Sequence, residues 1–190
     1  MKYHTGSEMM SGYRRDITEI RQKMRKAQAE IEPQEVVDYE FATPTGPVKL
    51  SELFGKHEDL MVIHNMGRSC PACTLWADGY NGIHAHVTSR AAFVVSSPDA
   101  PDVQQAIAAS RGWTFPMVSH QGTSFAADMG YATEDKRWRP GISVFQRRGD
   151  AIVRVSDTRL CPGDDFCTLY HFFDLLPEGA AGWSPKFSYS

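Results

Sequence analysis

The sequence predicts a mixed α/β fold in which helices cover a central mixed sheet. Short apolar runs typical of buried strands alternate with helical patterns through the middle of the chain, and a hairpin and a helix close it. Such alternation is typical of helices packed against a sheet. The length of 190 residues, with 42% hydrophobic and 23% charged residues, favours one globular domain with an appendage.

The appendage is an N-terminal helix that ends before Pro33. Its apolar residues are spaced by four, three, four, three and four positions: Tyr13, Ile17, Ile20, Met24, Ala27 and Ile31. A stripe this narrow is typical of helix pairing, so the helix either lies on its own domain or forms the arm of a homodimer. Its basic residues are interleaved with acidic ones, which indicates a solvated face and no nucleic-acid partner.

A β-hairpin is expected after this helix. Residues 37–41 alternate between apolar and polar, residues 44–47 contain two prolines and a glycine, and residues 48–50 form the second strand. Ser51 is placed to cap a short helical turn.

The middle of the chain contains three further strands and three helical segments. The strands are expected at residues 60–63, 91–95 and 115–119. A helix is expected to start at the CPAC motif and to break near Gly79 and Gly82; a second runs from Pro101 to Gly112, and a third covers residues 123–131.

A second hairpin and a final helix close the domain. The stretch ISVFQRRGDAIVRV contains two β runs around Gly149, and Asp164 or Asp165 caps the helix FCTLYHFFDLL, which stops at Pro177. The tail after Gly179 is expected to be loose. The predicted organisation is therefore an N-terminal helix at residues 1–33, a domain at 34–178 and a tail at 179–190.

Composition excludes several classes of function. The net charge of −3 gives no basic field for nucleic acid or for an anionic membrane. No run of 18 apolar residues and no signal sequence is present, so a cytoplasmic protein with no membrane partner is expected. Four cysteines are too few for a disulfide framework, and in a reducing compartment a close pair is catalytic or metal-binding more often than structural.

The close pair is Cys70 and Cys73, in the motif CPAC. The motif follows a predicted buried strand and opens a helix, with Pro71 suited to the first turn. Unpaired N–H groups at a helix N-terminus stabilise negative charge, so we expect a lowered pKa for Cys70. Cys70 is then the attacking thiolate, and Cys73, one turn further in, is the resolving thiol.

A CxxC motif can also bind zinc or simply fill space. Zinc requires a second pair of ligands at compact spacing, whereas the next cysteine is Cys161. His84 and His86 could offer two nitrogens from a strand, although histidines near a loop are usually surface residues. We therefore expect no metal at the motif.

The order of strand, CxxC and helix, with Pro140 before a downstream hairpin, resembles the thioredoxin-like superfamily. The segment GWTFPMVSHQGTSFAADMGY is similar to the branch that contains peroxiredoxins. The motifs CPACTLWADGYNG, RGWTFPMVS, PGISVF and YHFFDLLP resemble a bacterial family of unknown function labelled predicted dithiol-disulfide oxidoreductases, over about residues 12–177. The resemblance implies a three-layer sandwich with a central mixed sheet, an N-terminal hairpin and an added long helix.

The same resemblance implies roles for individual residues. Cys70 and Cys73 match the redox pair, Pro140 matches a cis-proline beside it, and Arg139 would border the substrate groove. His64 stands where thioredoxins hold a buried aspartate that takes the proton of the second cysteine. A histidine could do this with a pKa nearer neutrality, or it could be a core residue bonded to a backbone carbonyl.

The chain also departs from the family patterns. Ser69 replaces the tryptophan that precedes the pair in thioredoxins, and Trp76 or Trp138 could supply an aromatic wall instead, or merely pack. The peroxiredoxin pattern requires a threonine or serine three positions before its cysteine; superposed on Cys73, that position is Cys70.

A second pair, Cys161 and Cys167, has no counterpart in the family pattern. These cysteines are either incidental or accessory thiols that act as an electron relay or a resolving partner, in which case one must come within disulfide distance of the CPAC motif or of the other.

The resulting hypothesis is thiol–disulfide exchange on a protein or small-molecule disulfide, with no cofactor. The alternatives are a redox-inactive binding or dimerisation module with the same fold, and a peroxiredoxin-like peroxidase.

Overall fold

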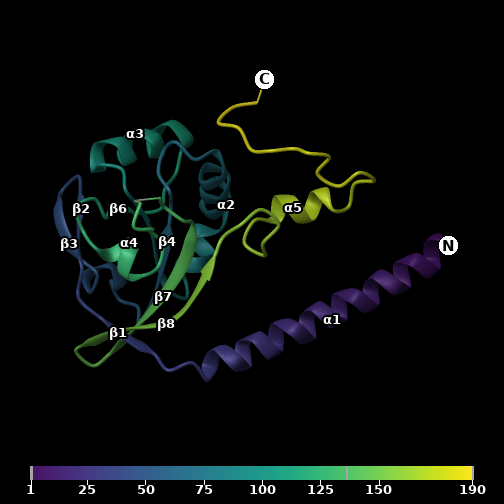
Figure 1. Ribbon diagram of the computed structural model, residues 1–190, viewed down its shortest axis with the longest axis horizontal. Coiled ribbons are helices and arrows are strands. Elements are labelled where there is room, and N and C mark those ends of the chain that lie inside the picture. Colours follow the sequence, from purple (N-terminus) through teal and green to yellow (C-terminus); the bar gives the residue numbers. More distant parts are fainter. Residues whose placement is uncertain (1, 136, 190) are drawn as a thin grey trace. The chain divides into compact units, whose positions relative to one another are not determined.

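The computed structural model describes residues 2–135 and 137–189 (Figure 1). The chain divides into two compact units, Met1–Pro33 and Gln34–Ser190. None of the described helices is long and apolar enough to cross a membrane.

The first unit contains one helix, α1 (Tyr3–Ala29). It begins ten positions before the predicted stripe, because the residues ahead of Tyr13 continue the helix despite Gly6 and Gly12. At its C-terminus the backbone N–H of Glu30 donates to the Ala27 carbonyl, and the N–H of Ile31 donates to the Gln28 carbonyl.

The second unit is built on an eight-stranded mixed sheet with the order β1-β8-β7-β4-β5-β6-β2-β3. Its strands are β1 (Gln34–Val36), β2 (Glu40–Thr43), β3 (Gly46–Lys49), β4 (Asp59–His64), β5 (Ala92–Ser97), β6 (Met117–Ser119), β7 (Gly141–Arg148) and β8 (Ala151–Arg159). Strands β4, β5 and β6 are parallel neighbours, and the remaining pairs are antiparallel. Both predicted hairpins, β2–β3 and β7–β8, are present.

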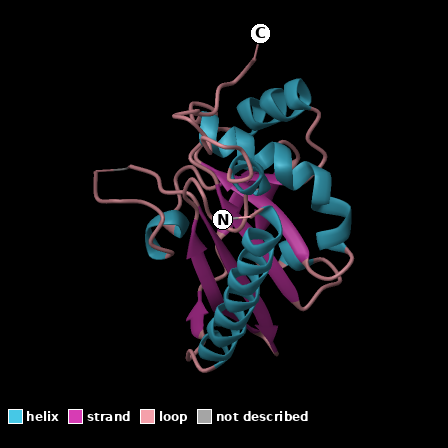
Figure 2. Cartoon of the chain, turned by 90° about the vertical axis from the view of Figure 1, so that its right-hand side faces the viewer, coloured by secondary structure: helices cyan, strands magenta, loops and turns pink. Residues whose placement is uncertain are grey.

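Helices cover both faces of this sheet, as Figure 2 shows for the second unit. They are the 3-10 helix η1 (Glu52–Phe54), α2 (Pro71–Thr88), α3 (Pro101–Arg111), α4 (Phe125–Asp128) and α5 (Thr168–Phe173). Successive residues of a strand point to opposite faces, so Val62 packs with Phe54 and Phe125 while Ile63 packs with Trp76. The predicted three-layer α/β sandwich is confirmed.

Several element boundaries differ from the prediction. Helix α2 runs through Gly79 and Gly82, so the predicted break is wrong, and His84 and His86 lie on a helix instead of a strand. Each glycine costs about 1 kcal/mol in a helix, which burial of Trp76, Ala77 and Tyr80 outweighs. Strand β1 was not predicted; it is too short to show a pattern and forms through pairing with β8.

The C-terminal segment also differs. Helix α5 begins at Thr168, because the Asp164 carboxylate accepts hydrogen bonds from the N–H groups of Phe166 and Cys167 and so holds the turn before the helix. The tail, expected to be loose, contacts the domain: Arg111 Nη1 donates to the carbonyl of Phe187 at 2.8 Å.

Candidate functional site

The CPAC motif lies where strand β4 passes into helix α2. Cys70 is the N-cap of α2, and its Sγ accepts a hydrogen bond from the N–H of Cys73 at 3.1 Å. Pro71 occupies the first turn, where its missing N–H costs nothing. All four cysteines of the chain are free thiols in this structure. The helix therefore presents its N-terminal donors to the sulfur of Cys70.

The pKa values of the two thiols of the motif are shifted in opposite directions. The side-chain hydrogen bond from Cys73 lowers the pKa of Cys70 from 9.0 to about 7; burial opposes this, and backbone N–H groups of Cys73 and Ala72 support it. The same hydrogen bond and then burial raise the pKa of Cys73. Cys70 is therefore the thiol of the pair that ionises first, while Cys73 keeps its proton near pH 7.

The loop before the motif is held by hydrogen bonds to strand β5 and the turn that follows it. The N–H of Asn65 donates to the Ser96 carbonyl at 2.8 Å, and the N–H of Arg68 donates to the Asp99 carboxylate at 2.7 Å. Gly67 has a φ of 95°, and a Cβ added there would lie 3.0 Å from an Asp99 oxygen. Only glycine fits this position without strain.

His64 ends strand β4 and is 2% exposed. Its Nε2 lies 2.9 Å from the Ser143 Oγ, its ring stacks on Tyr131 at 3.9 Å, and its Nδ1 has no hydrogen-bond partner. Burial lowers its pKa well below the ordinary value, with smaller contributions from His120 and Arg154. Of the two alternatives for His64, a base with a pKa nearer neutrality disagrees with this burial, and the imidazole is neutral at pH 7.

A second buried histidine, His120, follows strand β6. Its Nδ1 lies 2.8 Å from the Ser96 Oγ, and burial lowers its pKa to about 4. Trp138, considered above as an aromatic wall, packs against this ring at 5.0 Å. Sequence reasoning missed His120 because only the pairing of β5 with β6 places it at the same edge of the sheet as His64.

A cavity of about 130 Å³ lies beside Cys73. It is lined by Ile63, His64, Asn65, Met66, Ala72, Cys73, Trp76, Tyr80, Pro140, Leu160, Cys161 and Pro162. Trp76, Pro140 and Cys161 therefore line the same cavity as Cys73, the second cysteine of the motif. Arg139 is not among the described residues that line the cavity, although it precedes Pro140.

The Arg139–Pro140 bond is trans, as are the other described peptide bonds, so the expectation of a cis-proline is wrong. The segment is held by pairing on both sides: the N–H of Arg139 donates to the Tyr131 carbonyl, and the Pro140 carbonyl accepts from the N–H of Leu160. These bonds place Pro140 beside the cavity in an extended backbone.

The accessory cysteines differ in their surroundings. Cys161 is exposed and lines the cavity. Cys167 is buried in the core cluster that contains Trp76, and burial raises its pKa. In the described part of the chain, no three histidine, cysteine, aspartate or glutamate side chains form a group that could hold a metal ion.

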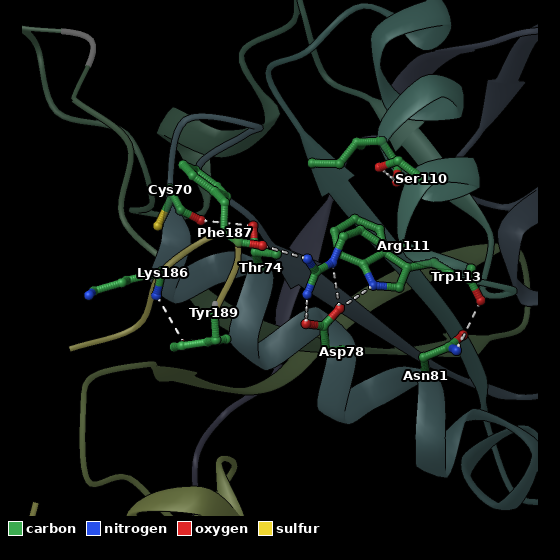
Figure 3. Close-up of polar contacts among 12 residues, drawn as sticks. Cys70, Thr74, Asp78, Asn81, Ser110, Arg111, Trp113, Lys186, Phe187 and Tyr189 are labelled. Carbon is green, nitrogen blue, oxygen red and sulfur yellow. Dashed lines mark hydrogen bonds and ion pairs between the residues drawn. The ribbon is translucent and has the colours of Figure 1, made fainter. Parts of the chain in front are cut away.

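A polar cluster fixes helix α2 two turns beyond Cys70 (Figure 3). Asp78 accepts hydrogen bonds from Trp113 Nε1 at 2.8 Å and from the Arg111 guanidinium, which also binds the tail at Phe187. Closer to the motif, the Thr74 hydroxyl donates to the Cys70 carbonyl. The cluster orients α2 and contains no reactive group of the site.

Comparison with known proteins agrees with this architecture. The family model "Bacterial protein of unknown function (DUF899)" matches residues 11–186. A peroxiredoxin Q structure from Xanthomonas campestris is 18% identical with a TM-score of 0.56, covering 70% of this chain and 87% of that one. Reduced Prx3 from Vibrio vulnificus is 14% identical with a TM-score of 0.57, covering 70% and 89%.

Peroxidoxin BcpB from Mycobacterium tuberculosis is 23% identical with a TM-score of 0.54, covering 67% of this chain and 84% of that one. The search of curated proteins finds no match. Likeness at these identities concerns the fold, and it confirms the thioredoxin-like architecture expected from the sequence.

Proposed function

This chain belongs to the DUF899 family of bacterial proteins of unknown function, and we propose that it is a thiol–disulfide exchange protein that uses Cys70 and Cys73. The observation that carries the proposal is the hydrogen bonding of Cys73 to the Cys70 sulfur at the N-terminus of α2. This arrangement stabilises one thiolate and keeps a second, protonated thiol next to it.

The reaction begins with the Cys70 thiolate. It attacks one sulfur of a substrate disulfide, the substrate S–S bond breaks, and one substrate thiolate leaves. Cys73 then loses its proton and attacks the Cys70 sulfur of the mixed disulfide, which releases the second substrate thiolate. The substrate gains two electrons, the chain holds a Cys70–Cys73 disulfide, and an external dithiol reduces it again.

His64 is the proposed acceptor of the Cys73 proton. It lines the same cavity as Cys73, it is neutral, and its Nδ1 is free of protein partners. A neutral imidazole can accept a proton during the attack of Cys73. The burial that lowers its pKa also favours release of that proton once the disulfide has formed.

The cavity supports a substrate with an apolar group next to its disulfide. Its walls are mainly apolar, with Trp76 and Pro140 among them. Its volume of about 130 Å³ is close to that of cavities that bind a benzene-sized molecule, about 150 Å³. An aromatic or branched aliphatic side chain of a protein disulfide fits this description.

Cys161 is the better placed of the two accessory thiols. It is exposed and lines the cavity with Cys73, whereas Cys167 is enclosed in the core. We assign a relay role to Cys161 alone.

Insulin reduction in the presence of dithiothreitol tests the proposal. The native chain should accelerate the reaction, and Cys70→Ser should abolish the acceleration. With insulin alone, in the absence of dithiothreitol, reduced Cys73→Ser should accumulate a mixed disulfide that non-reducing electrophoresis detects. Cys167→Ala is the matched control, because this thiol lies outside the cavity. Full activity in Cys70→Ser, or peroxide consumption without insulin reduction, would refute exchange.

A further inference from the structure

Helix α1 has no buried residue over its 27 residues. Ile17, Ile20 and Met24 are 47%, 54% and 64% exposed. Most helical stability in proteins comes from packing of an apolar face and not from the intrinsic propensity of the residues. Among the described residues of the first unit nothing packs on the apolar face of α1, so this face requires a partner from outside that unit.

The spacing of the apolar face indicates what that partner is. The structure carries the pattern back to the start of the helix, with alternating steps of three and four: Tyr3, Gly6, Met10, Tyr13, Ile17, Ile20, Met24 and Ala27, followed by Ile31. This is a seven-residue repeat with one narrow seam. A helix that lies on a globular surface or a membrane uses a wider stripe, whereas a two-position seam suits a second helix with the same repeat.

We propose that α1 pairs in parallel with α1 of a second copy of this chain, as a two-stranded coiled coil. The charges beside the seam favour this orientation. Asp16 precedes Ile17 and Arg21 follows Ile20, and in a parallel pair these two flanking positions face each other across the seam. An antiparallel pair centred on Ile17 and Ile20 brings Arg14 against Arg21 as well as Asp16 against Lys23, so repulsion offsets attraction, whereas the parallel pair keeps the attraction of Asp16 for Arg21 without a like-charge pair.

Molar mass in solution tests the pairing. Sedimentation equilibrium of the full chain should give twice the chain mass of 21.3 kDa. The double variant Ile17→Glu with Ile20→Glu places charges in the seam and should raise the dimer Kd roughly tenfold or more. Thr18→Glu with Gln22→Glu is the matched control: it adds the same charge to the same helix away from the seam and should remain dimeric.

Helix content and activity separate this inference from other effects. Circular dichroism should show that both double variants retain a folded second unit, and insulin reduction per chain should be equal in both because the CPAC motif lies outside α1. The inference thus stands or fails independently of the proposed exchange activity.

A charge exchange tests the orientation. Asp16→Arg should weaken the dimer, and the addition of Arg21→Asp should restore it. A monomeric native chain, equal Kd values for the seam variant and its control, or binding of monomers to phosphatidylserine vesicles in place of self-association would overturn the proposal. Failure of the second exchange to restore the dimer would overturn the parallel orientation.

Discussion

Replacing Cys73 by alanine should raise the pKa of Cys70. The hydrogen bond from the Cys73 side chain is the largest cause of the shift from 9.0 to about 7, which corresponds to a change of roughly a hundredfold in acidity. The backbone N–H groups of the helix N-terminus remain in the variant. We therefore expect a partial rise of about one pH unit.

The pH midpoint of alkylation is the appropriate assay. A thiolate of higher pKa is also a stronger nucleophile, so a single rate at pH 7 would understate the change. Iodoacetamide labelling from pH 5 to 10, with fragment mass spectra that distinguish Cys70 from the other cysteines, gives the midpoint directly. Cys73→Ser is the control, since its hydroxyl can still donate and should keep the midpoint closer to the native value.

Two results would refute the reasoning. An unchanged midpoint in Cys73→Ala would show that the helix N-terminus alone lowers the pKa of Cys70. A midpoint near that of a free cysteine, about 8.5, in the native chain would show that Cys70 is not an activated thiolate, and it would favour a redox-inactive module.

Three further predictions concern stability and the accessory thiol. The folded pKa values of His64 and His120 are depressed, so their contribution to the free energy of unfolding is complete above pH 6.5 and is lost as the pH falls, for His120 down to about pH 4. The slope should reach about 1.4 kcal/mol per pH unit and histidine, and urea titrations with a flat pH profile would contradict this. Gly67→Ala should lower the free energy of unfolding by about 1–2 kcal/mol, because the residue has a positive φ and the new methyl group would meet the Asp99 carboxylate. Gly79→Ala should raise it by about 0.5–1 kcal/mol in the same urea assay, because Gly79 lies in helix α2 and a Cβ there meets no other atom. After diamide oxidation, peptide mapping should find the Cys70–Cys73 disulfide in the native chain and a Cys73–Cys161 disulfide in Cys70→Ser; its absence would end the relay role of Cys161.

Local patterns predicted much of the fold. The buried run before the CPAC motif became β4, the proline and glycine around residues 101–112 bounded α3, and both hairpins formed where turn residues separate β runs. These elements depend on backbone preferences and on the periodicity of apolar residues, which the sequence shows directly.

Other features could not be predicted because they depend on contacts between distant segments. Helix α2 continues past Gly79 because its face is buried against the sheet, and Arg139–Pro140 is trans in a segment paired with Tyr131 and Leu160. His120 reaches the edge of the sheet near His64 only through the parallel pairing of β4, β5 and β6.

The sequence by itself determined that Cys70 and Cys73 follow a strand and open a helix. This order places Cys70 at the helix N-terminus, where its pKa is lowered. The tertiary structure decided what surrounds them: a neutral His64, a cavity that includes Cys161, and a buried place for Cys167. Helix capping is local and leaves a sequence pattern, whereas burial and cavity walls arise from segments that meet only when the sheet closes.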